Sequence, residues 1–426
     1  MTSKLFTLIF IFLSLFIAAL FTQNGDVVWL AVPFLAYMLV GLLQFPATDT
    51  VRLAAQRRIS QAGTEGEPVL DMEVTLINQG PCIPVLTLED TQPEGMKLLD
   101  GQTTKRTAVL PGEEALLEYS LVQKRGRYAW DSIQAWVSDP FGLASAKITL
   151  PAQAEYSVQP RRDNFRRLPV RPYHTLHSPG SVPARRAGTG TDFWGVRLYH
   201  PGDSLRWLDW RLTARHPGQF FTKEFEQEEV ADIGLILDAR QQTDVRVGED
   251  SLFEHSVRAA ASLAEGLLHQ GHRVSLLVLS EEYVQVFPGY GKGQLNRIMR
   301  CLSAVKAASE SKIGSLEYLP LRMFSSRALL VVLSSLGRYD SAFFPRLRAA
   351  GYQALLISPD PYDFAYATLP PDPPSQQAFH LARLERRIQL KGISQLQVQV
   401  IDWQVSQPLF PLVRAAFGHL RGQRER

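Results

Sequence analysis

Residues 230–243 read VADIGLILDARQQT, and their centre is an uninterrupted apolar run, Ile233–Leu237, followed directly by Asp238. A short run that is apolar at every position indicates a strand buried on both faces, as in a parallel sheet between helices. Further strands are predicted downstream, at Val274–Leu279, Ala328–Leu333, Ala354–Ile357 and Leu396–Ile401. Stretches of helical periodicity separate them, so residues 230–426 are predicted to form a doubly wound, Rossmann-like α/β domain.

Residues 47–160 show a different pattern, in which apolar and polar residues mix within short segments. Turn signals such as Pro93-Glu94-Gly95 and Asp139-Pro140-Phe141-Gly142 separate these segments. The predicted strands are Pro68–Asn78, Ile83–Glu89, Ala115–Val122 and Ile133–Val137. Short strands with turns at regular intervals are typical of a β-sandwich, which we therefore expect here.

Residues 1–46 are predicted to form a transmembrane helical hairpin. The runs Leu5–Phe21 and Val27–Phe45 contain no charged residue, and a short polar turn separates them. Each run is long enough to cross about 30 Å of hydrocarbon. Only helices satisfy their own backbone hydrogen bonds in lipid, so both runs are expected to be helical. The alternative is a cleaved signal peptide, because Lys4 and the apolar stretch after it fit the charged and hydrophobic regions of such a peptide.

The flanking charges predict the orientation of this hairpin. Lys4 precedes the first run, and Arg52, Arg57 and Arg58 follow the second, whereas the intervening turn holds only Asp26. Positive residues favour the cytoplasmic side. We therefore expect a multi-pass protein of the inner (plasma) membrane that contacts the bilayer through residues 5–45 and has cytoplasmic soluble domains. The two cysteines, Cys82 and Cys301, suggest no disulfide framework, in agreement with that compartment.

The formal net charge of the chain is only +3, which argues against a nucleic-acid partner. Positive charge is nevertheless concentrated between Pro160 and Arg186, a stretch rich in arginine and proline. This stretch lacks periodicity and is predicted to be an extended, solvated connector. The alternative is a patch that binds anionic lipids or an acidic partner.

Residues 161–229 combine this connector with a segment of unusual composition, which runs from Gly188 to Glu229. Acidic and basic residues alternate in it, with large aromatics between them: Asp192, Arg197, Asp203, Arg206, Asp209, Arg211 and Arg215. We expect a partly buried ion-pair network, because the arginine fork can hold a carboxylate through two hydrogen bonds. Asp203, after the Pro201-Gly202 turn, is predicted to cap a short helix.

This segment resembles the signature of the family called domain of unknown function 58. The resemblance rests on Gly188, Gly190, Asp192, Phe193, Arg197, Tyr199, Pro201, Gly202, Asp203, Arg206, Asp209, Trp210, Ala214 and Arg215. Two further features are similar to the family, namely the membrane hairpin and the pair of motifs Arg125-Gly126-Arg127-Tyr128 and Asp139-Pro140-Phe141-Gly142-Leu143. The resemblance implies a C-terminal von Willebrand factor A-like domain and a MoxR-type AAA+ ATPase as partner.

A von Willebrand factor A-like domain would carry a metal site beginning Asp-x-Ser-x-Ser after its first strand. Here Asp238 is followed by Ala239-Arg240-Gln241-Gln242, so both serines are absent. After the later strand that ends at Leu333, serines stand where a second aspartate is usual. Because a divalent cation needs several oxygen ligands, we expect a degenerate site at Asp238, with no metal and no cofactor.

The function expected from these features is that of a membrane-anchored interaction or assembly protein that adapts a MoxR-type ATPase and is not an enzyme. The expected docking face is the top of the sheet, near Asp238 to Thr243, where ligands of doubly wound folds bind. The signature residues would hold the α/β domain against the sandwich or present a partner surface. The alternative is a metal-dependent hydrolase or nuclease using Asp203 and Glu224, although Lys223-Glu224 reverses the common Glu-x-Lys order. An envelope structural protein without an ATPase partner is a further possibility.

Overall fold

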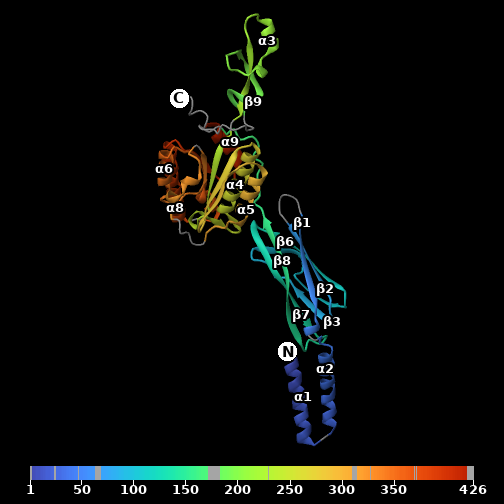
Figure 1. Cartoon of the computed structure of the whole chain (residues 1–426). Helices are drawn as coiled ribbons and strands as arrows, with labels where there is room; N and C mark the ends of the chain where they lie inside the picture. Colours follow the sequence, from blue (N-terminus) through green and yellow to red (C-terminus); the bar gives the residue numbers. More distant parts are fainter. Residues whose placement is uncertain are drawn as a thin grey trace. The chain divides into compact units, whose positions relative to one another are not determined.

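The computed structural model describes residues 2–23, 25–46, 48–62, 69–170, 183–228, 230–308, 314–326, 328–368, 370 and 372–419. The chain forms two compact units, Met1–Val158 and Gln159–Arg426 (Figure 1). The first unit holds two helices and an all-β domain. The second holds a two-stranded hairpin and an α/β domain.

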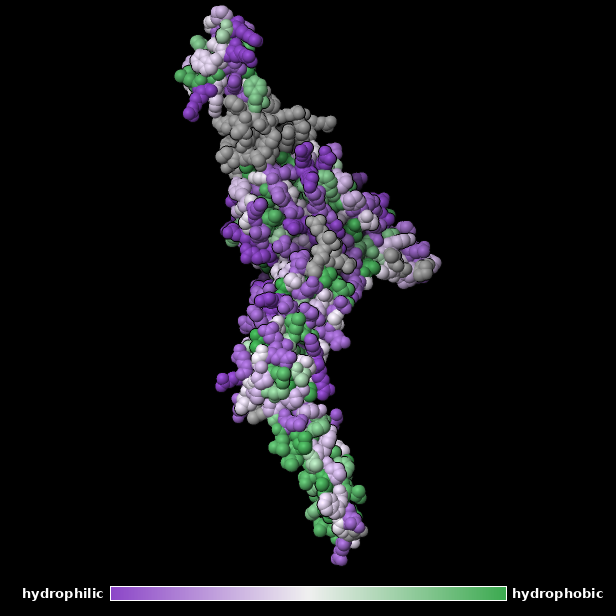
Figure 2. All heavy atoms as spheres, turned by 90° about the vertical axis from the view of Figure 1, so that its right-hand side faces the viewer, coloured by the Kyte–Doolittle hydropathy of each residue, from purple (hydrophilic) through white to green (hydrophobic). Residues whose placement is uncertain are grey.

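The first unit begins with the two predicted helices, α1 (Ser3–Thr22) and α2 (Gly25–Leu43). They lie side by side, and both are long and apolar enough to cross a membrane. Most of their large apolar side chains point outward, which gives the hairpin a hydrophobic surface (Figure 2). Gln23, which ends α1, adopts a left-handed conformation.

Two four-stranded antiparallel sheets follow, with the orders β1-β2-β6-β4 and β5-β3-β7-β8. Their strands are β1 (Leu53–Ala62), β2 (Val69–Asn78), β3 (Ile83–Glu89), β4 (Met96–Gly101), β5 (Thr104–Val109), β6 (Glu114–Gln123), β7 (Gly126–Ser138) and β8 (Ser145–Val158). Side chains of both sheets share the same buried clusters, so the sheets pack face to face. Strict alternation of half-buried and buried residues along β2 explains why the sequence predicted it.

Arg57 has a different role from the one that its position after the second helix suggested. It lies on β1, and its Nη2 atom is 2.5 Å from Oδ1 of Asp90, with both side chains fully buried. The hydroxyl of Tyr119 donates a 2.8 Å hydrogen bond to the same carboxylate, and burial together with Asp90 raises the pKa of Tyr119. Arg57 therefore belongs to the sandwich core, while Lys4, Arg52 and Arg58 are exposed.

The α/β domain contains a six-stranded mixed sheet of order β15-β14-β11-β16-β17-β18, in which only β15 runs antiparallel to its neighbour. The strands are β11 (Asp232–Asp238), β14 (Arg273–Leu279), β15 (Tyr283–Gly289), β16 (Leu329–Leu333), β17 (Gln353–Pro359) and β18 (Gln399–Trp403). A small hairpin, β12 (Arg246–Val247) and β13 (Asp250–Ser251), lies outside this sheet.

Helices cover both faces of the sheet. One buried cluster joins it to α4 (Leu252–His269), α5 (Gly291–Ala304) and α9 (Leu409–His419). The other joins it to α6 (Phe343–Ala349) and α8 (Pro373–Gln395), and α7 (Pro361–Ala365) follows β17. Alternate residues of β11 enter the two clusters, with Leu235 on one face and Ile236 on the other. Burial on both faces explains the continuous apolar run in the sequence.

The prediction of a solvated connector is wrong for its first residues, 160–170. Phe165, Leu168 and Val170 are buried in the core cluster that contains α4 and α9. Gly266 on α4 allows this close approach, because a Cβ atom there would lie 2.6 Å from the carbonyl oxygen of Phe165. These apolar residues therefore extend the α/β core, while Arg161, Arg162, Arg166 and Arg167 are exposed. Residues 171–182 lie outside the described residues.

Candidate functional site

The signature segment forms an antiparallel hairpin of β9 (Pro183–Leu198) and β10 (Phe221–Glu228), which we call the arm. Its tip carries a short 3-10 helix, Leu205–Trp207, and helix α3 (Trp210–Arg215) (Figure 1). Leu208 forms an isolated bridge to Thr222, which ties the tip back to β10. The sequence had predicted an ion-pair network and a short helix here but not the two strands, because the alternation of charges hides the strand pattern.

Arg197 organises the base of the tip. Its Nη1 and Nη2 atoms donate to the two carboxylate oxygens of Asp203, at 2.7 and 2.8 Å, and its Nε atom donates to Glu224 at 2.8 Å. The backbone N–H of His200 donates a further 2.9 Å hydrogen bond to Asp203. These bonds fasten the Pro-Gly-Asp turn to both strands. Gly202 suits this turn, because its φ of +108° is unfavourable for residues with a Cβ atom.

Asp203 does not cap a helix, contrary to the prediction. Ser204 precedes the 3-10 helix and makes no side-chain capping bond. The capping residue is Asp209, whose carboxylate accepts from the backbone N–H groups of Arg211 (3.1 Å) and Leu212 (3.0 Å) at the start of α3. The two aspartates therefore have different roles. Asp203 binds the guanidinium of Arg197, and Asp209 caps the N-terminus of α3.

The predicted ion-pair network is smaller than expected and lies at the surface. Arg206, Arg211 and Arg215 are exposed, and in the described part of the arm none of them has an ion pair. The side chain of Asp192 lies outside the described residues. Tyr199 packs edge-on against Phe220, with ring centroids 6.4 Å apart. Among the described side chains of the arm, charge pairing therefore centres on Arg197.

The arm also displays large apolar side chains. Four of them are more than half exposed: Phe193, Leu205, Trp210 and Phe220. A two-stranded hairpin has no second layer to cover such groups, and isolated hairpins are only marginally stable in water. Exposed aromatic residues beside arginines are the composition found at the centres of protein interfaces. The arm thus has the chemistry of a docking surface.

Replacing Arg197 by glutamine is expected to raise the pKa of Asp203. Hydrogen bonds from Arg197, and then the backbone N–H of His200, lower this pKa to about 2 from 3.8. Loss of the guanidinium should return the pKa most of the way to 3.8, because only the His200 bond remains. A carboxyl ¹³C NMR titration of aspartate-labelled protein measures this change, and Arg211→Gln is the matched control. An unchanged titration in Arg197→Gln would show that Arg197 is not the partner in solution.

A second candidate site lies at the carboxyl end of the central strands of the α/β sheet. Arg240, just after β11, is fully buried. Its Nε and Nη2 atoms donate to Asp238 at 2.8 and 2.7 Å, and its Nη1 and Nη2 atoms donate to Asp340 at 3.1 and 2.7 Å. The hydroxyl of Ser334 donates a 2.6 Å bond to Asp238. One guanidinium therefore lies between two buried carboxylates.

The electrostatics of this site favour a permanent cation. Burial alone lowers the pKa of Arg240, but the hydrogen bonds and charges of Asp238 and Asp340 outweigh burial and raise it. The guanidinium thus occupies the carboxyl end of β11, where ligands of doubly wound folds bind. Within the described residues no group of three or more His, Cys, Asp or Glu side chains is placed to hold a metal ion. The sequence had pointed to Asp238 and Arg240 but missed Asp340, which is 100 residues from Arg240.

A second buried arginine, Arg386 on α8, binds the neighbouring strand ends. Its Nη2 atom donates to Asp402 at 2.8 Å and to the carbonyl of Ser358 at 3.0 Å. Its Nη1 atom donates to the carbonyl of Ser335 at 3.1 Å. The strand ends of β16, β17 and β18 are therefore joined through one side chain. Internal ion pairs and hydrogen bonds therefore occupy these groups at the carboxyl edge of the sheet.

Parts of the chain are similar to one sequence family and to one curated protein. The family model described as "Protein of unknown function DUF58" matches residues 195–373. The uncharacterized protein YeaD of Bacillus subtilis (strain 168) is 28% identical over 292 residues, which cover 65% of this chain and 69% of YeaD.

Two solved structures have much lower sequence identity to the chain. The FixG-related protein from Vibrio parahaemolyticus is 16% identical and covers 24% of this chain and 94% of its own, with a TM-score of 0.16. The GH20 exo β-N-acetylglucosaminidase from Vibrio harveyi is 10% identical. The match covers 73% of this chain and 57% of the glucosaminidase chain, with a TM-score of 0.17. Neither describes the fold. The chain is thus similar to the DUF58 family over residues 195–373, which hold the tip of the arm and the Asp238–Arg240–Asp340 cluster.

Proposed function

We propose that this chain is a membrane-anchored interaction protein, not an enzyme, and that the arm is its docking surface. The observation that carries the proposal is the exposure of Phe193, Leu205, Trp210 and Phe220 on a hairpin that cannot bury them. Around them Arg206, Arg211 and Arg215 have no ion pair among the described residues, and such free cations select an acidic partner.

The membrane anchor in this proposal is the hairpin of α1 and α2, inserted in the inner (plasma) membrane through residues 5–45. The hydrophobic exterior of both helices supports insertion. Exposed Lys4, Arg52 and Arg58 at one end, against Asp26 at the other, support a cytoplasmic location of the soluble domains. The anchor would keep the chain at the membrane.

We further infer that the α/β domain is von Willebrand factor A-like. Counted along the domain, its strand order is 3-2-1-4-5-6, the order of many nucleotide-binding sheets, here with an antiparallel third strand. Asp238 ends the first strand, as in the metal-binding members, but Arg240 supplies the cation. The proposed partner is the one that the resemblance of the signature residues implies, a MoxR-type AAA+ ATPase.

A metal-dependent hydrolase or nuclease has less support. Its proposed carboxylates, Asp203 and Glu224, are both bound to the guanidinium of Arg197. A cation would have to displace that arginine from two charged hydrogen bonds, which are among the stronger contacts in proteins. The arrangement suits a rigid support for the arm tip better than an open coordination site.

Affinity purification of the full-length protein from membranes tests the docking role. With a non-hydrolysable ATP analogue present, we expect an AAA+ ATPase to co-purify, as identified by mass spectrometry. Trp210→Asp should reduce its recovery at least about tenfold, because an aromatic anchor at an interface contributes ~2 kcal/mol or more. The matched control is Phe287→Asp on β15, since Phe287 is 68% exposed and Trp210 is 65% exposed. Equal recovery with both variants would refute the arm as the docking surface.

A further inference from the structure

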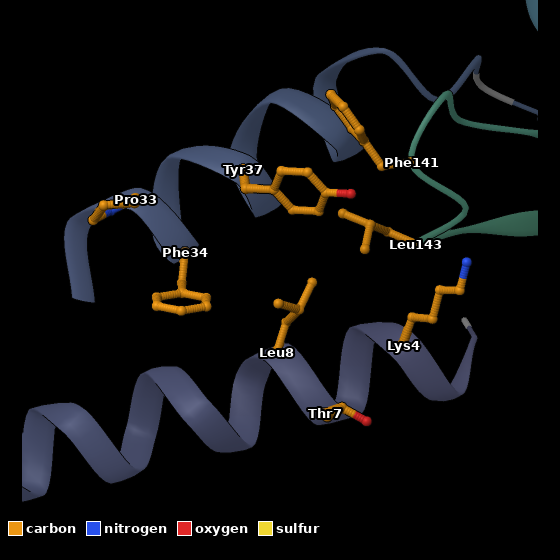
Figure 3. Close-up of a pocket in the computed structure, with 8 residues that line it drawn as sticks. All are labelled: Lys4, Thr7, Leu8, Pro33, Phe34, Tyr37, Phe141 and Leu143. Carbon is orange, nitrogen blue, oxygen red and sulfur yellow. The ribbon is translucent and has the colours of Figure 1, made fainter. Parts of the chain in front are cut away.

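A cleft lies between the two N-terminal helices, at the end that faces the β-sandwich (Figure 3). Its volume is about 550 Å³, within the range of ligand pockets. Eight residues line it: Lys4, Thr7 and Leu8 from α1, Pro33, Phe34 and Tyr37 from α2, and Phe141 and Leu143 from the loop between β7 and β8. The walls of the cleft are therefore formed by both helices and by one loop of the sandwich.

Several contacts hold that loop on the hairpin. The carboxylate of Asp139 accepts from the backbone N–H groups of Phe141 and Ala144, at 2.9 and 2.7 Å, which fixes the turn. The hydroxyl of Thr2 donates a 2.7 Å hydrogen bond to the carbonyl of Gly142. The rings of Tyr37 and Phe141 lie with centroids 4.4 Å apart. The cleft is thus a formed site with fixed walls.

Gly41 shows how closely the loop approaches α2. A Cβ atom at this position would lie 2.6 Å from Cδ1 of Leu143 and 3.1 Å from the ring of Phe141. Only a glycine leaves room for this packing. The loop therefore packs directly against α2 beside the cleft.

The chemistry of the cleft changes along its length. Leu8 and Phe34 face each other across its apolar part, while Lys4 lies beside the loop at the opposite end (Figure 3). In the described part of the first unit, the Lys4 ammonium has neither an ion pair nor a hydrogen bond. The carboxylate of Asp139, on the same loop, is already bound by backbone N–H groups. An apolar channel with one free cation at its end suits a ligand with a chain and an anionic head.

We propose that this cleft binds one anionic phospholipid, whose phosphate group contacts Lys4 and whose acyl chain lies between Leu8 and Phe34. The proposal rests on the membrane insertion proposed above, because only then does the cleft open to lipid. Lys4 would lie at the depth of the phosphate groups, since it is at the end of the apolar part of α1. The bound lipid would fill the gap that the two helices leave, and so strengthen the attachment of the sandwich loop to the anchor.

Quantification of lipid retained by the purified full-length protein tests this site. The protein is inserted in nanodiscs of equimolar phosphatidylglycerol and phosphatidylcholine, extracted in mild detergent, and analysed for bound lipid by mass spectrometry. Wild type should retain about one phosphatidylglycerol per chain. Lys4→Gln should lower its preference over phosphatidylcholine roughly fivefold, the effect of one cation near an anionic lipid. Leu8→Trp should fill the cleft and reduce retention of both lipids.

Two control variants separate the cleft from general effects. Arg52→Gln removes an equal charge on the same side of the hairpin, and Leu20→Trp adds an equal bulk on its exposed outer surface. Neither should alter the retained lipid. Equal retention of both lipids by wild type, or no effect of Lys4→Gln and Leu8→Trp, would overturn the proposal. A stable dimer that Leu8→Trp dissociates would overturn it too, because a second copy would then fill the cleft.

Carbonate extraction of membranes, done first on every variant, distinguishes failure of this site from failure of the anchor. Release of the wild-type protein into the supernatant would refute membrane insertion, and the lipid site with it. A protein that stays in the pellet but shows no lipid preference would refute the lipid site alone. Variants that stay in the pellet with wild-type yield are folded well enough for their lipid content to be compared.

Discussion

Replacing Arg240 by methionine is expected to destabilise the α/β domain by about 3–5 kcal/mol, because it leaves two buried carboxylates without their cation. Asp238 and Asp340 would then face each other in the interior, with only Ser334 and backbone N–H groups as donors. Denaturant unfolding of the full chain in detergent, followed by tryptophan fluorescence, measures the change.

The control for Arg240 is Arg246→Met. Arg246 pairs with Asp244, but its side chain is largely exposed, so its loss should cost less than about 1 kcal/mol. A second variant removes the charges together, with Arg240→Met, Asp238→Asn and Asp340→Asn. It should be more stable than Arg240→Met alone, because no unpaired charge remains buried. If Arg240→Met costs no more than the control, the cluster does not stabilise the fold.

Lowering the pH from 7 to 5 is expected to reduce the stability of the α/β domain by about 2 kcal/mol through His272 alone. Burial lowers the pKa of His272 from 6.5 to about 4. The unfolded chain therefore takes up a proton at higher pH than the folded one. The stability from neutral His272 is complete above pH 6.5 and is lost as the pH falls from there to about 4. Urea unfolding midpoints at pH 7 and pH 5 measure this loss.

His272→Gln should make the stability less dependent on pH over this range. Glutamine does not titrate, and its side-chain oxygen can accept from the backbone N–H of Ala231, as Nδ1 of His272 does at 3.3 Å. His269→Gln is the matched control, since His269 lies on the same stretch of chain but is largely exposed. An unchanged pH dependence in His272→Gln would mean that His272 is protonated in the folded protein or does not govern its acid sensitivity.

The elements that could be predicted were those whose residues carry a strong local pattern. The central strands β11, β14, β16 and β17 were recognisable because burial on both faces requires an apolar residue at nearly every position. Helices α1 and α2 were recognisable from their length and lack of charge. Strands β4 and β5 were not, since most of their residues are exposed and show no alternation.

The candidate sites were predicted less well, because their side chains belong together only after folding. The sequence places Arg197 near Asp203, and this pair forms, but Glu224 joins it from the other strand of the arm. Phe165 was hidden among arginines, and its burial depends on the space that Gly266 leaves on α4. The expected cap at Asp203 is absent because Ser204, and not Asp203, directly precedes the 3-10 helix.

The sequence by itself determined three classes of structure: a two-helix hairpin, antiparallel strands, and an alternation of buried strands and helices. It could do so because hydrophobic periodicity is a local property. Only the tertiary structure decided which charges meet. The chain brings Arg57 to Asp90, and Arg240 to Asp340, across long separations in sequence. Such pairs form because a buried charge is stable only beside its opposite, and the packing of the sheets selects which residue supplies it.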